Sequence, residues 1–299
     1  MPPEEPRADE PARPAVVLVA TPIGNLGDIS RRAVEALTTA DVIAAEDTRR
    51  TRPFLTALGI PAGGRLVSFH GPHEAELAVR LVARIVERRQ RLVCVTDAGM
   101  PGISDPGERL VVAALAAGVP VEVVPGPSAA LAALVLSGLP TGRFVFEGFL
   151  PRKGRQRADR LASLRAEERT VVLFEAPHRL ESTLADLATA LGPDRPVVVA
   201  RELTKRFETV WRGTLAGAAG RGGEADGPEA RGEQVIVIGP AAPAPLEEPG
   251  DDALELALQA ELAGGASTRD AAAVVANRLG VNRRRAYALA TSLRKAARS

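Results

Sequence analysis

The residues best suited to chemistry lie in the segment VCVTDAGMPGISDPG, residues 93–107, where an apolar run breaks at an acidic residue into a loop rich in glycine and proline. Asp97 stands where the apolar run ends, so a strand would deliver its carboxylate to that loop. Glycines let backbone approach a ligand closely, and prolines stiffen the loop. The carboxylate could accept a hydrogen bond from an amine or a ribose hydroxyl. The alternative is a rigid turn in which Asp97 and Asp105 act as local caps.

Two further apolar runs end in loops of the same kind. Residues 15–20 (AVVLVA) lead into TPIGNLGD, and residues 121–124 lead into PGPSA. Ligands of open α/β sheets bind at the carboxyl ends of the strands. The sequence contains neither GxGxxG nor GxxxxGK[ST], which excludes the usual pyrophosphate cradles. Three such loops without a phosphate cradle favour a compact ligand with hydroxyls, an amino acid moiety and an adenine, such as S-adenosylmethionine.

The elements that would position these loops alternate between strand and helix, which predicts a parallel α/β sheet in a first domain over residues 15–138. The expected strands cover residues 16–20, 42–45, 66–69, 92–96 and 121–124, and the expected helices cover residues 30–39, 50–58, 73–89, 107–117 and 128–136. A second domain is expected over residues 143–239, with a mixed sheet and few intervening helices. Its expected strands cover residues 144–149, 170–175, 196–203, 208–215 and 234–239.

Other segments differ in composition. Residues 1–14 lack the apolar stretch and the early positive cluster of a secretory signal, so we expect a disordered tail and a cytoplasmic protein. No apolar run approaches the roughly 20 residues that a membrane span needs, so no membrane association is expected. A glycine-rich loop is expected at residues 217–233. A linker at 240–252 then leads to a helical module at 253–299.

Charge is distributed unevenly along the chain, although the net charge is only +1. Residues 266–299 carry eight basic side chains and one acid, and because that segment is +7 the rest of the chain is −6. A basic appendage on an acidic body favours a polyanionic partner. Thr268 is expected to cap one helix and Asn282 the next, with a turn at Gly280, a pattern typical of a small helix-turn-helix. The alternative is a helical packing module with a solvated arginine-rich face.

Cysteine and histidine usage argues against disulfide and metal chemistry. The single cysteine, Cys94, falls inside an expected strand and suits a small buried apolar residue. His70, His73 and Glu74 lie close together, but Pro72 breaks the helical spacing that would bring them onto one metal ion. We therefore expect no metal site.

Seven segments, taken in order, carry a resemblance to a known family. They are LVATPIGNLGDIS (18–30), AAEDTR (44–49), VTDAGMPGISDPG (95–107), PGPSA (125–129), FEGFLPRKG (146–154), FEAPHR (174–179) and ARELTKRFE (200–208). They resemble the bacterial small-subunit ribosomal RNA methyltransferase I family of the tetrapyrrole methylase superfamily, from about residue 16 to the carboxyl terminus. The resemblance implies a class III S-adenosylmethionine methyltransferase fold of two α/β domains, with the cofactor in the cleft between them, and usually a homodimer.

The reaction implied by the resemblance is 2′-O-methylation of a cytidine in the decoding region of 16S ribosomal RNA, cytidine 1402 in conventional numbering. The substrate would be the RNA itself or the assembled small ribosomal subunit. Carried onto this sequence, the family's cofactor contacts fall on Pro22, Asp97, Met100, Ser128, Ala129, Phe174 or Glu175, and Leu203.

Methyl transfer to a ribose hydroxyl needs alignment of the reacting atoms and loss of the hydroxyl proton, so a base or a cation should lie near the oxygen. We favour Lys205 for this role, either as a desolvated amine or as a cation that stabilises the alkoxide. Asp47 and Arg49 are expected to orient the substrate. The alternatives are that Asp47 and Arg49 only cap a helix and pair with each other, and that Lys205 only contacts phosphate.

Two basic clusters are expected to contact RNA phosphates. They are Arg152, Lys153 and Arg155 in the loop after the FEGF segment, and Arg283, Arg284 and Arg285 in the helical module. Two other functions stay open at this point. One is a methyltransferase of the same fold that acts on a tetrapyrrole or precorrin, and the other is a non-catalytic RNA-binding protein.

Overall fold

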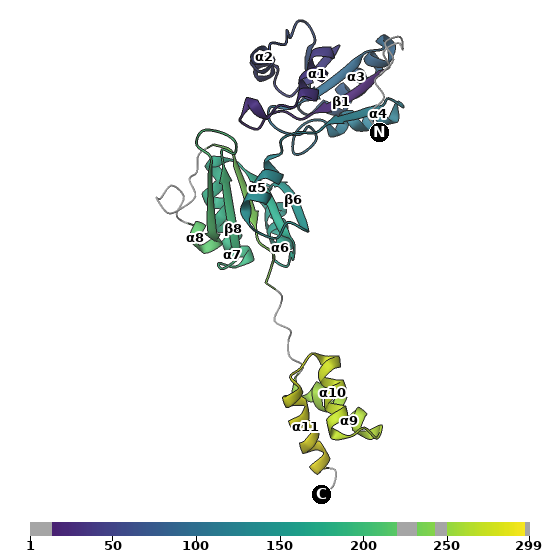
Figure 1. The fold of residues 1–299 in the computed structure, drawn as a ribbon, viewed down its shortest axis with the longest axis vertical. Helices are drawn as coiled ribbons and strands as arrows, with labels where there is room; N and C mark the ends of the chain where they lie inside the picture. Colours follow the sequence, from purple (N-terminus) through teal and green to yellow (C-terminus); the bar gives the residue numbers. More distant parts are fainter. Residues whose placement is uncertain (1–13, 220–231, 243–249, 297–299) are drawn as a thin grey trace. The chain divides into compact units, whose positions relative to one another are not determined.

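The structure is a computed structural model that describes residues 14–219, 232–242 and 250–296. The expected amino-terminal tail and most of the expected glycine-rich loop and linker fall outside these ranges. The chain divides into two compact units, residues 1–241 and residues 242–299. Figure 1 shows both units coloured along the sequence. No helix within the described ranges is long and apolar enough to cross a membrane.

The larger unit begins with a parallel sheet in the order β3-β2-β4-β1-β5, which confirms the predicted fold of this half. Its strands are β1 (Ala15–Val19), β2 (Val42–Ala45), β3 (Leu66–Ser68), β4 (Arg91–Val95) and β5 (Val121–Val124). Between them lie a short 3-10 helix η1 (Leu26–Asp28), α1 (Arg31–Thr39), α2 (Thr48–Ala57), α3 (Glu74–Arg88) and α4 (Glu108–Ala116). Because all five strands run the same way, the loops after β1, β2, β4 and β5 leave the sheet at one edge.

Helices cover both faces of this first sheet. Alternate residues of a strand point to opposite faces, so Val16 and Leu18 of β1 pack with α3 and α4, and Val17 and Val19 pack with α1 and α2. Strands buried on both faces must be apolar throughout, which explains the unbroken AVVLV and LVCV runs. Cys94 is one of these buried residues, and burial raises the pKa of its thiol to about 12.

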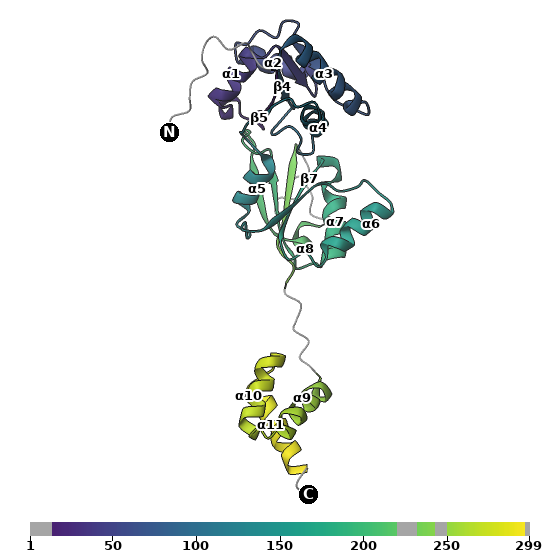
Figure 2. The ribbon, with the colours of Figure 1, turned by 90° about the vertical axis from the view of Figure 1, so that its right-hand side faces the viewer.

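The second sheet is mixed, as predicted, with the order β6-β7-β10-β8-β9. Its strands are β6 (Phe144–Phe149), β7 (Thr170–Glu175), β8 (Pro196–Arg201), β9 (Thr209–Thr214) and β10 (Gln234–Ile238). Strands β6 and β7 are parallel and the other neighbours are antiparallel. Its helices are α5 (Ala129–Ser137), α6 (Arg155–Leu164), the 3-10 helix η2 (Pro177–Arg179), α7 (Leu180–Leu191) and α8 (Leu215–Ala218). Figure 2 shows α5 on one face of this sheet and α6, α7 and α8 on the other.

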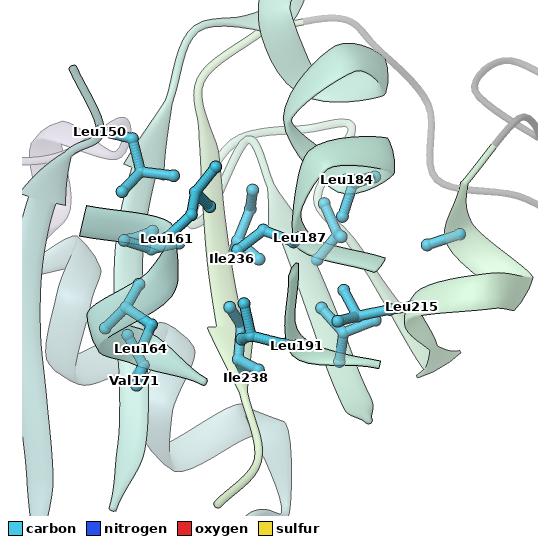
Figure 3. Close-up of a cluster of buried hydrophobic side chains, with 14 of the residues drawn as sticks. Leu150, Leu161, Leu164, Val171, Leu184, Leu187, Leu191, Leu215, Ile236 and Ile238 are labelled. Carbon is cyan, nitrogen blue, oxygen red and sulfur yellow. The ribbon is translucent and has the colours of Figure 1, made fainter. Parts of the chain in front are cut away.

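The expectation of few helices between these strands is wrong. Helix α7 carries Leu180, Leu184, Leu187 and Leu191, whose spacing of four, three and four residues is that of one helix face. These leucines pack with Ile236 and its neighbours in the core cluster of Figure 3. Burying each such side chain contributes roughly 1.5–3 kcal/mol, so this face fixes the helix on the sheet.

The smaller unit consists, in its described part, of α9 (Asp251–Ala263), α10 (Thr268–Leu279) and α11 (Arg283–Ala296), which share one apolar core. Gly280 ends α10 in the left-handed region at φ 67°, and the Asn282 side chain accepts from the Arg284 amide at 2.8 Å, as predicted for the turn and the second cap. The predicted first cap is wrong by one residue. Ser267, not Thr268, accepts from the Asp270 amide, because Ser267 is the last residue with extended backbone.

Candidate functional site

A cavity of about 260 Å³ lies in the larger unit at the carboxyl ends of the parallel strands, close to the roughly 300 Å³ at which pockets for small ligands begin. The first sheet contributes residues that follow β1, β2 and β4, and the second sheet contributes residues of β6, β7 and β10. The start of α5 and the turn after β8 complete the wall. The strand-end loops that the sequence predicts at one site thus line one cavity of the fold.

The structure brings six of the eight predicted cofactor contacts to this cavity. They are Asp97, Met100, Ser128, Ala129, Phe174 and Leu203. Pro22 lines an adjoining hollow that it shares with Asp97 and Arg50. Several of these positions offer backbone groups, and Ser128 also caps α5 by accepting from the Leu131 amide.

The Glu175 side chain does not reach the cavity. Phe174 and Glu175 are neighbours on β7, so their side chains point to opposite faces of the sheet, and the glutamate faces α7. Glu175 is 3% exposed, and its carboxylate accepts from the Thr183 hydroxyl at 2.6 Å and the Ala176 amide at 2.8 Å, with Arg179 Nε at 3.3 Å. Of the two alternatives left by the sequence, the geometry therefore favours Phe174.

The Asp97 loop is locked to the first loop by backbone bonds. The Thr21 amide donates to the Gly99 carbonyl at 2.9 Å, and the Gly99 amide donates back to Thr21 at 3.1 Å. Gly99 has φ +84°, which a residue with a Cβ adopts only at a cost. This pairing holds the Asp97 carboxylate at the cavity wall.

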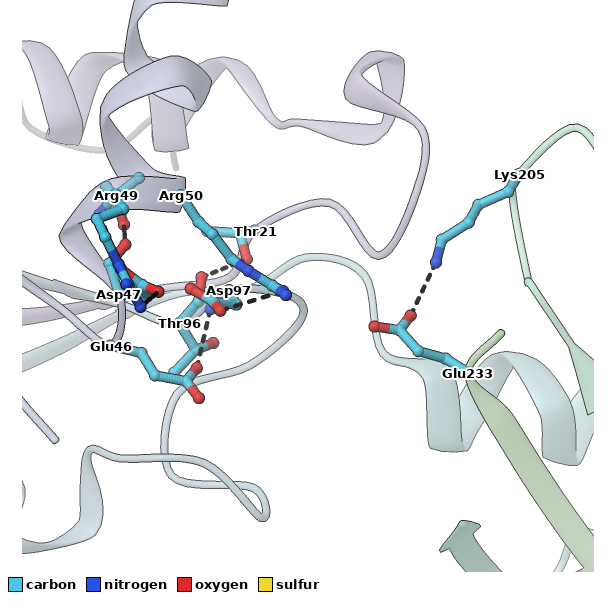
Figure 4. A network of polar contacts seen from close by, with 10 residues as sticks. Thr21, Glu46, Asp47, Arg49, Arg50, Thr96, Asp97, Lys205 and Glu233 are labelled. Carbon is cyan, nitrogen blue, oxygen red and sulfur yellow. Dashed lines mark hydrogen bonds and ion pairs between the residues drawn. The ribbon is translucent and has the colours of Figure 1, made fainter. Parts of the chain in front are cut away.

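One oxygen of Asp97 is paired and the other is not. Oδ2 lies 3.3 Å from Arg50 Nη1, and the Asp97 amide donates to Glu46 Oε2 at 3.0 Å, as Figure 4 shows. Oδ1 is buried and accepts no hydrogen bond from the described residues. Burial raises the pKa of Asp97, Glu46 adds to the rise, and Arg50 opposes it. An unpaired buried acceptor costs about 1–3 kcal/mol, which a ligand amine or hydroxyl would relieve.

Two acidic side chains of the cavity wall, Asp105 and Glu233, were not predicted as site residues. Burial raises the pKa of Asp105 to about 7, and the charges of Glu46, Asp97 and Glu233 add to the rise. Within the described residues Asp105 accepts no hydrogen bond, so the alternative in which it caps the turn is wrong. The one feature of the sequence that pointed to Asp105 was its place in the same glycine-rich loop as Asp97.

Lys205 lies in the turn after β8 and pairs with two carboxylates. Its Nζ is 3.0 Å from Glu202 Oε1 and 3.0 Å from Glu233 Oε2, the latter drawn in Figure 4. Burial alone would lower the pKa of Lys205, but the hydrogen bonds to Glu233 and Glu202 outweigh it, so the pKa is raised. The geometry therefore favours the cation among the two roles considered for Lys205 and disfavours the neutral amine.

Asp47 and Arg49 lie at the rim rather than on the cavity wall. Asp47 caps α2 by accepting from the Arg49 amide at 2.8 Å, and the Arg49 guanidinium bonds the same carboxylate at 3.0 and 2.8 Å. These bonds lower the pKa of Asp47 to about 2. Both residues line a shallow hollow with Arg50 and His70. Asp47 and Arg49 thus have the geometry of the alternative in which they cap a helix and pair with each other. The Arg49 side chain is nevertheless exposed, so a large substrate could reach it.

The predicted RNA contacts fall on two basic hollows. Arg152 and Lys153 line one beside α6 and α7, while Arg155 forms a surface ion pair with Asp159 at 3.5 Å. In the smaller unit, residues from α10 and α11 line another. They are Arg269, Ala272, Ala273, Arg283, Arg284 and Tyr287. Arg285 faces elsewhere and pairs with Asp251 of α9 at 2.7 Å.

No group of three or more histidine, cysteine, aspartate or glutamate side chains is placed to hold a metal ion within the ranges that the structure describes.

Comparison with known proteins places the chain in a family. A family model described as tetrapyrrole (corrin/porphyrin) methylases matches residues 15–219. A protein of Synechocystis named ribosomal RNA small subunit methyltransferase I is 45% identical over 92% of this chain and 97% of its own length. A protein of the same name from Xylella fastidiosa is 52% identical over 74% of this chain and 80% of its own. The solved uroporphyrin-III C-methyltransferase of Thermus thermophilus, in complex with S-adenosyl homocysteine, shares the fold, with a TM-score of 0.51 and 24% identity over 76% of this chain and 97% of that one. The chain belongs to the tetrapyrrole methylase family, and within it to the ribosomal RNA small subunit methyltransferase I proteins.

Proposed function

We propose that the protein transfers a methyl group from S-adenosylmethionine to the ribose 2′-hydroxyl of a decoding-region cytidine of 16S ribosomal RNA. The observation that carries the proposal is the cavity at the strand ends, where a buried oxygen of Asp97 has no donor among the described residues. Relatives that are 45% and 52% identical and named for small-subunit ribosomal RNA support the substrate.

The residues that line the cavity suit the chemistry of the cofactor. When bound, S-adenosylmethionine supplies a methyl carbon made electrophilic by the positively charged sulfur. Asp97 Oδ1 would accept from an amine or ribose hydroxyl of the cofactor, and the apolar side chains of Met100, Phe174 and Leu203 would cover its uncharged parts. Glycine is required at position 99 of that wall by its backbone, because a φ of +84° would strain a residue with a Cβ.

Lys205 supports the transfer as a cation. An attacking hydroxyl oxygen gains negative charge, which a fixed ammonium group stabilises. Glu202 and Glu233 hold the ammonium in place at 3.0 Å each, and its side chain is 29% exposed, so a substrate oxygen can approach it. In this role Lys205 acts on the RNA rather than on the cofactor.

The two basic hollows would hold the RNA. Arg152 and Lys153 on the larger unit, and Arg269, Arg283 and Arg284 on the smaller one, present guanidinium or ammonium groups to solvent. Such groups bind phosphate through charge and release counterions, so affinity should fall with salt. Tyr287 is half exposed in the second hollow and offers a ring on which an unpaired base can stack.

Helix α5 supports a homodimer. Its inner face packs on the second sheet through Ala130, Ala133 and Leu134. Its outer face leaves Leu131 51% and Val135 74% exposed, although a solvated helix face is normally polar. A second copy of the chain would cover this face. Val135→Glu should then shift the protein to the monomer in sedimentation, whereas a protein that is monomeric without the substitution would contradict the homodimer.

A complementation experiment tests the function. Ribose methylation is mapped on 16S ribosomal RNA from a strain that lacks the gene, with a plasmid that supplies either the intact chain or Asp97→Ala. We expect one cytidine of the decoding region to lose its 2′-O-methyl group in the deletion strain and to regain it only with the intact chain. Calorimetry with S-adenosylmethionine supplies the second measurement. Restored methylation without cofactor binding would contradict the proposal, and so would binding without any change in the RNA.

The same samples separate the two alternatives. A tetrapyrrole methyltransferase would leave the RNA unchanged and methylate a porphyrin-type substrate in vitro. A non-catalytic RNA-binding protein would bind the RNA and not the cofactor.

A further inference from the structure

We infer that Asp105 is the catalytic proton acceptor of this reaction, the group that takes the proton from the ribose 2′-hydroxyl as its oxygen attacks the methyl carbon. The inference rests on the proposed function. It begins from a chemical need, because a hydroxyl is a poor nucleophile until it loses its proton. Lys205 cannot meet that need, since its two carboxylate partners keep its ammonium group protonated.

Asp105 lines the cavity from a loop whose backbone is constrained. The Gly102 amide donates to the Pro106 carbonyl at 3.1 Å, which closes the turn that contains Asp105. Ser104 adopts φ 65°, a left-handed conformation that costs a serine about 1–3 kcal/mol. Strand β6 lies against this turn on the other side, since a Cβ added to Gly148 would lie only 2.9 Å from Ser104 Oγ. Backbone strain kept by contacts from both sheets is the pattern of a positioned functional group.

Of the carboxylates on the cavity wall, Asp105 alone has no hydrogen-bond or ion-pair partner among the described residues. In the part of the chain that the structure describes, the wall carries four carboxylates, those of Glu46, Asp97, Asp105 and Glu233. Glu46 accepts from the Asp97 amide, Asp97 pairs with Arg50, and Glu233 pairs with Lys205. Asp105 accepts no hydrogen bond and forms no ion pair with the described residues, so its oxygens are available to a substrate.

The charges around Asp105 suit proton transfer near neutral pH. It faces Glu46 and Asp97 from the first sheet and Glu233 from the second, while the cations Arg50 and Lys205 are engaged by two of those carboxylates. Burial and the three negative charges raise the pKa of Asp105 to about 7. A general base works best when its pKa lies near the working pH, because it is then ionised and still basic.

The step balances without a further reactant. The 2′-oxygen forms a bond to the methyl carbon as the carbon–sulfur bond breaks, and the sulfur keeps that electron pair and becomes a neutral thioether. The hydroxyl proton passes to Asp105, which returns it to water after the product leaves.

The test combines kinetics with two measurements that do not depend on turnover. Single-turnover methylation of the small-subunit substrate is followed against pH for the intact protein, Asp105→Asn, Asp105→Glu and the control Glu108→Gln, which removes an exposed charge three residues away. S-adenosyl homocysteine affinity is measured by calorimetry. The Asp105 carboxyl is titrated by carbon-13 NMR and assigned by its absence in Asp105→Asn.

We expect Asp105→Asn to lower the rate by about a hundredfold or more and to abolish the rise in rate near pH 7, with S-adenosyl homocysteine affinity within twofold. Asp105→Glu should recover part of the rate and its pH dependence, and Glu108→Gln should match the intact protein. The assigned carboxyl should titrate near pH 7.

An unchanged rate and pH profile in Asp105→Asn would overturn the inference. A loss of S-adenosyl homocysteine affinity equal to the loss of rate would also overturn it, because Asp105 would then be a cofactor ligand. If the intact protein methylates no small-subunit RNA, the proposed function and this role fall together. If it does and the variant keeps its rate, the role of Asp105 alone fails.

Discussion

Replacing Asp105 by asparagine should stabilise the protein at alkaline pH. Asparagine has nearly the same shape but cannot ionise, so it removes the cost of holding a charge beside three other carboxylates. In the unfolded chain the carboxyl has its ordinary pKa of 3.8, and in the folded protein burial and the neighbouring acids raise that pKa to about 7. The intact protein is therefore at no disadvantage below about pH 4. It loses stability relative to the variant as the pH rises to about 7, and the difference is constant above that.

The magnitude follows from the two pKa values. A rise from 3.8 to about 7 corresponds to about 4 kcal/mol of linked free energy. Asp105 is only partly buried, and solvent screening reduces the effect by about half, so we expect a gain of about 2 kcal/mol at pH 8. For a unit of this size the gain amounts to a rise in Tm of about 4–8 °C.

Thermal unfolding of the intact protein and Asp105→Asn at pH 4, 5.5 and 8 measures this dependence. The gain in Tm should be near zero at the lowest pH and largest at the highest. Glu108→Gln is the matched control, because it removes an exposed charge and should change stability by less than about 0.5 kcal/mol. Equal or lower stability of Asp105→Asn at pH 8 would refute the reasoning about charge at this site.

Three further predictions concern the cofactor, the chemistry and the RNA. Asp97→Ala should weaken S-adenosylmethionine binding at least tenfold, about 1.4 kcal/mol, in calorimetry, and unchanged affinity would remove Asp97 from the cofactor site. Lys205→Met should lower single-turnover methylation about a hundredfold with cofactor affinity nearly intact, and normal turnover would exclude Lys205 from the mechanism. In the full chain, Arg283→Glu with Arg284→Glu should weaken RNA binding and reduce its salt dependence by about one to two phosphate contacts, whereas Arg285→Ala should do so less because Arg285 pairs with Asp251. Equal effects of these two changes would contradict the role of the hollow between α10 and α11.

The position of the cavity could be predicted from local patterns. An apolar run that ends at a carboxylate and a glycine-rich turn identifies a strand end, and parallel strands bring such ends to one edge. Asp97, Met100 and Ser128 each follow one of these runs closely, so a strand places them directly. Where only a short, regular segment separates the motif from the side chain, the sequence is sufficient to place that side chain.

The sequence is least decisive where one residue of rotation determines which way a side chain points. Arg49 and Arg50 are adjacent near the start of α2, and successive residues of a helix point about 100° apart. Arg50 therefore reaches Asp97, while Arg49 turns back to the cap at Asp47. Phe174 and Glu175 differ in the same way on a strand. A motif limits the site to a few positions, but the packing of the whole element decides which of them faces the ligand.

The role of Asp105 depends on residues that are distant in the sequence, and for that reason no motif predicts it. Glu46 lies at the end of β2 and Glu233 just before β10, and only the folded chain brings their charges to the loop of Asp105. The same burial and charges that make the ionised Asp105 costly to the fold make it a good proton acceptor at neutral pH. If the carboxylate only stabilised the fold, replacing it by asparagine would destabilise the protein. If it is a base at this site, the same replacement should stabilise the protein and lower its activity. The opposite sign of the stability change distinguishes the two roles in one variant.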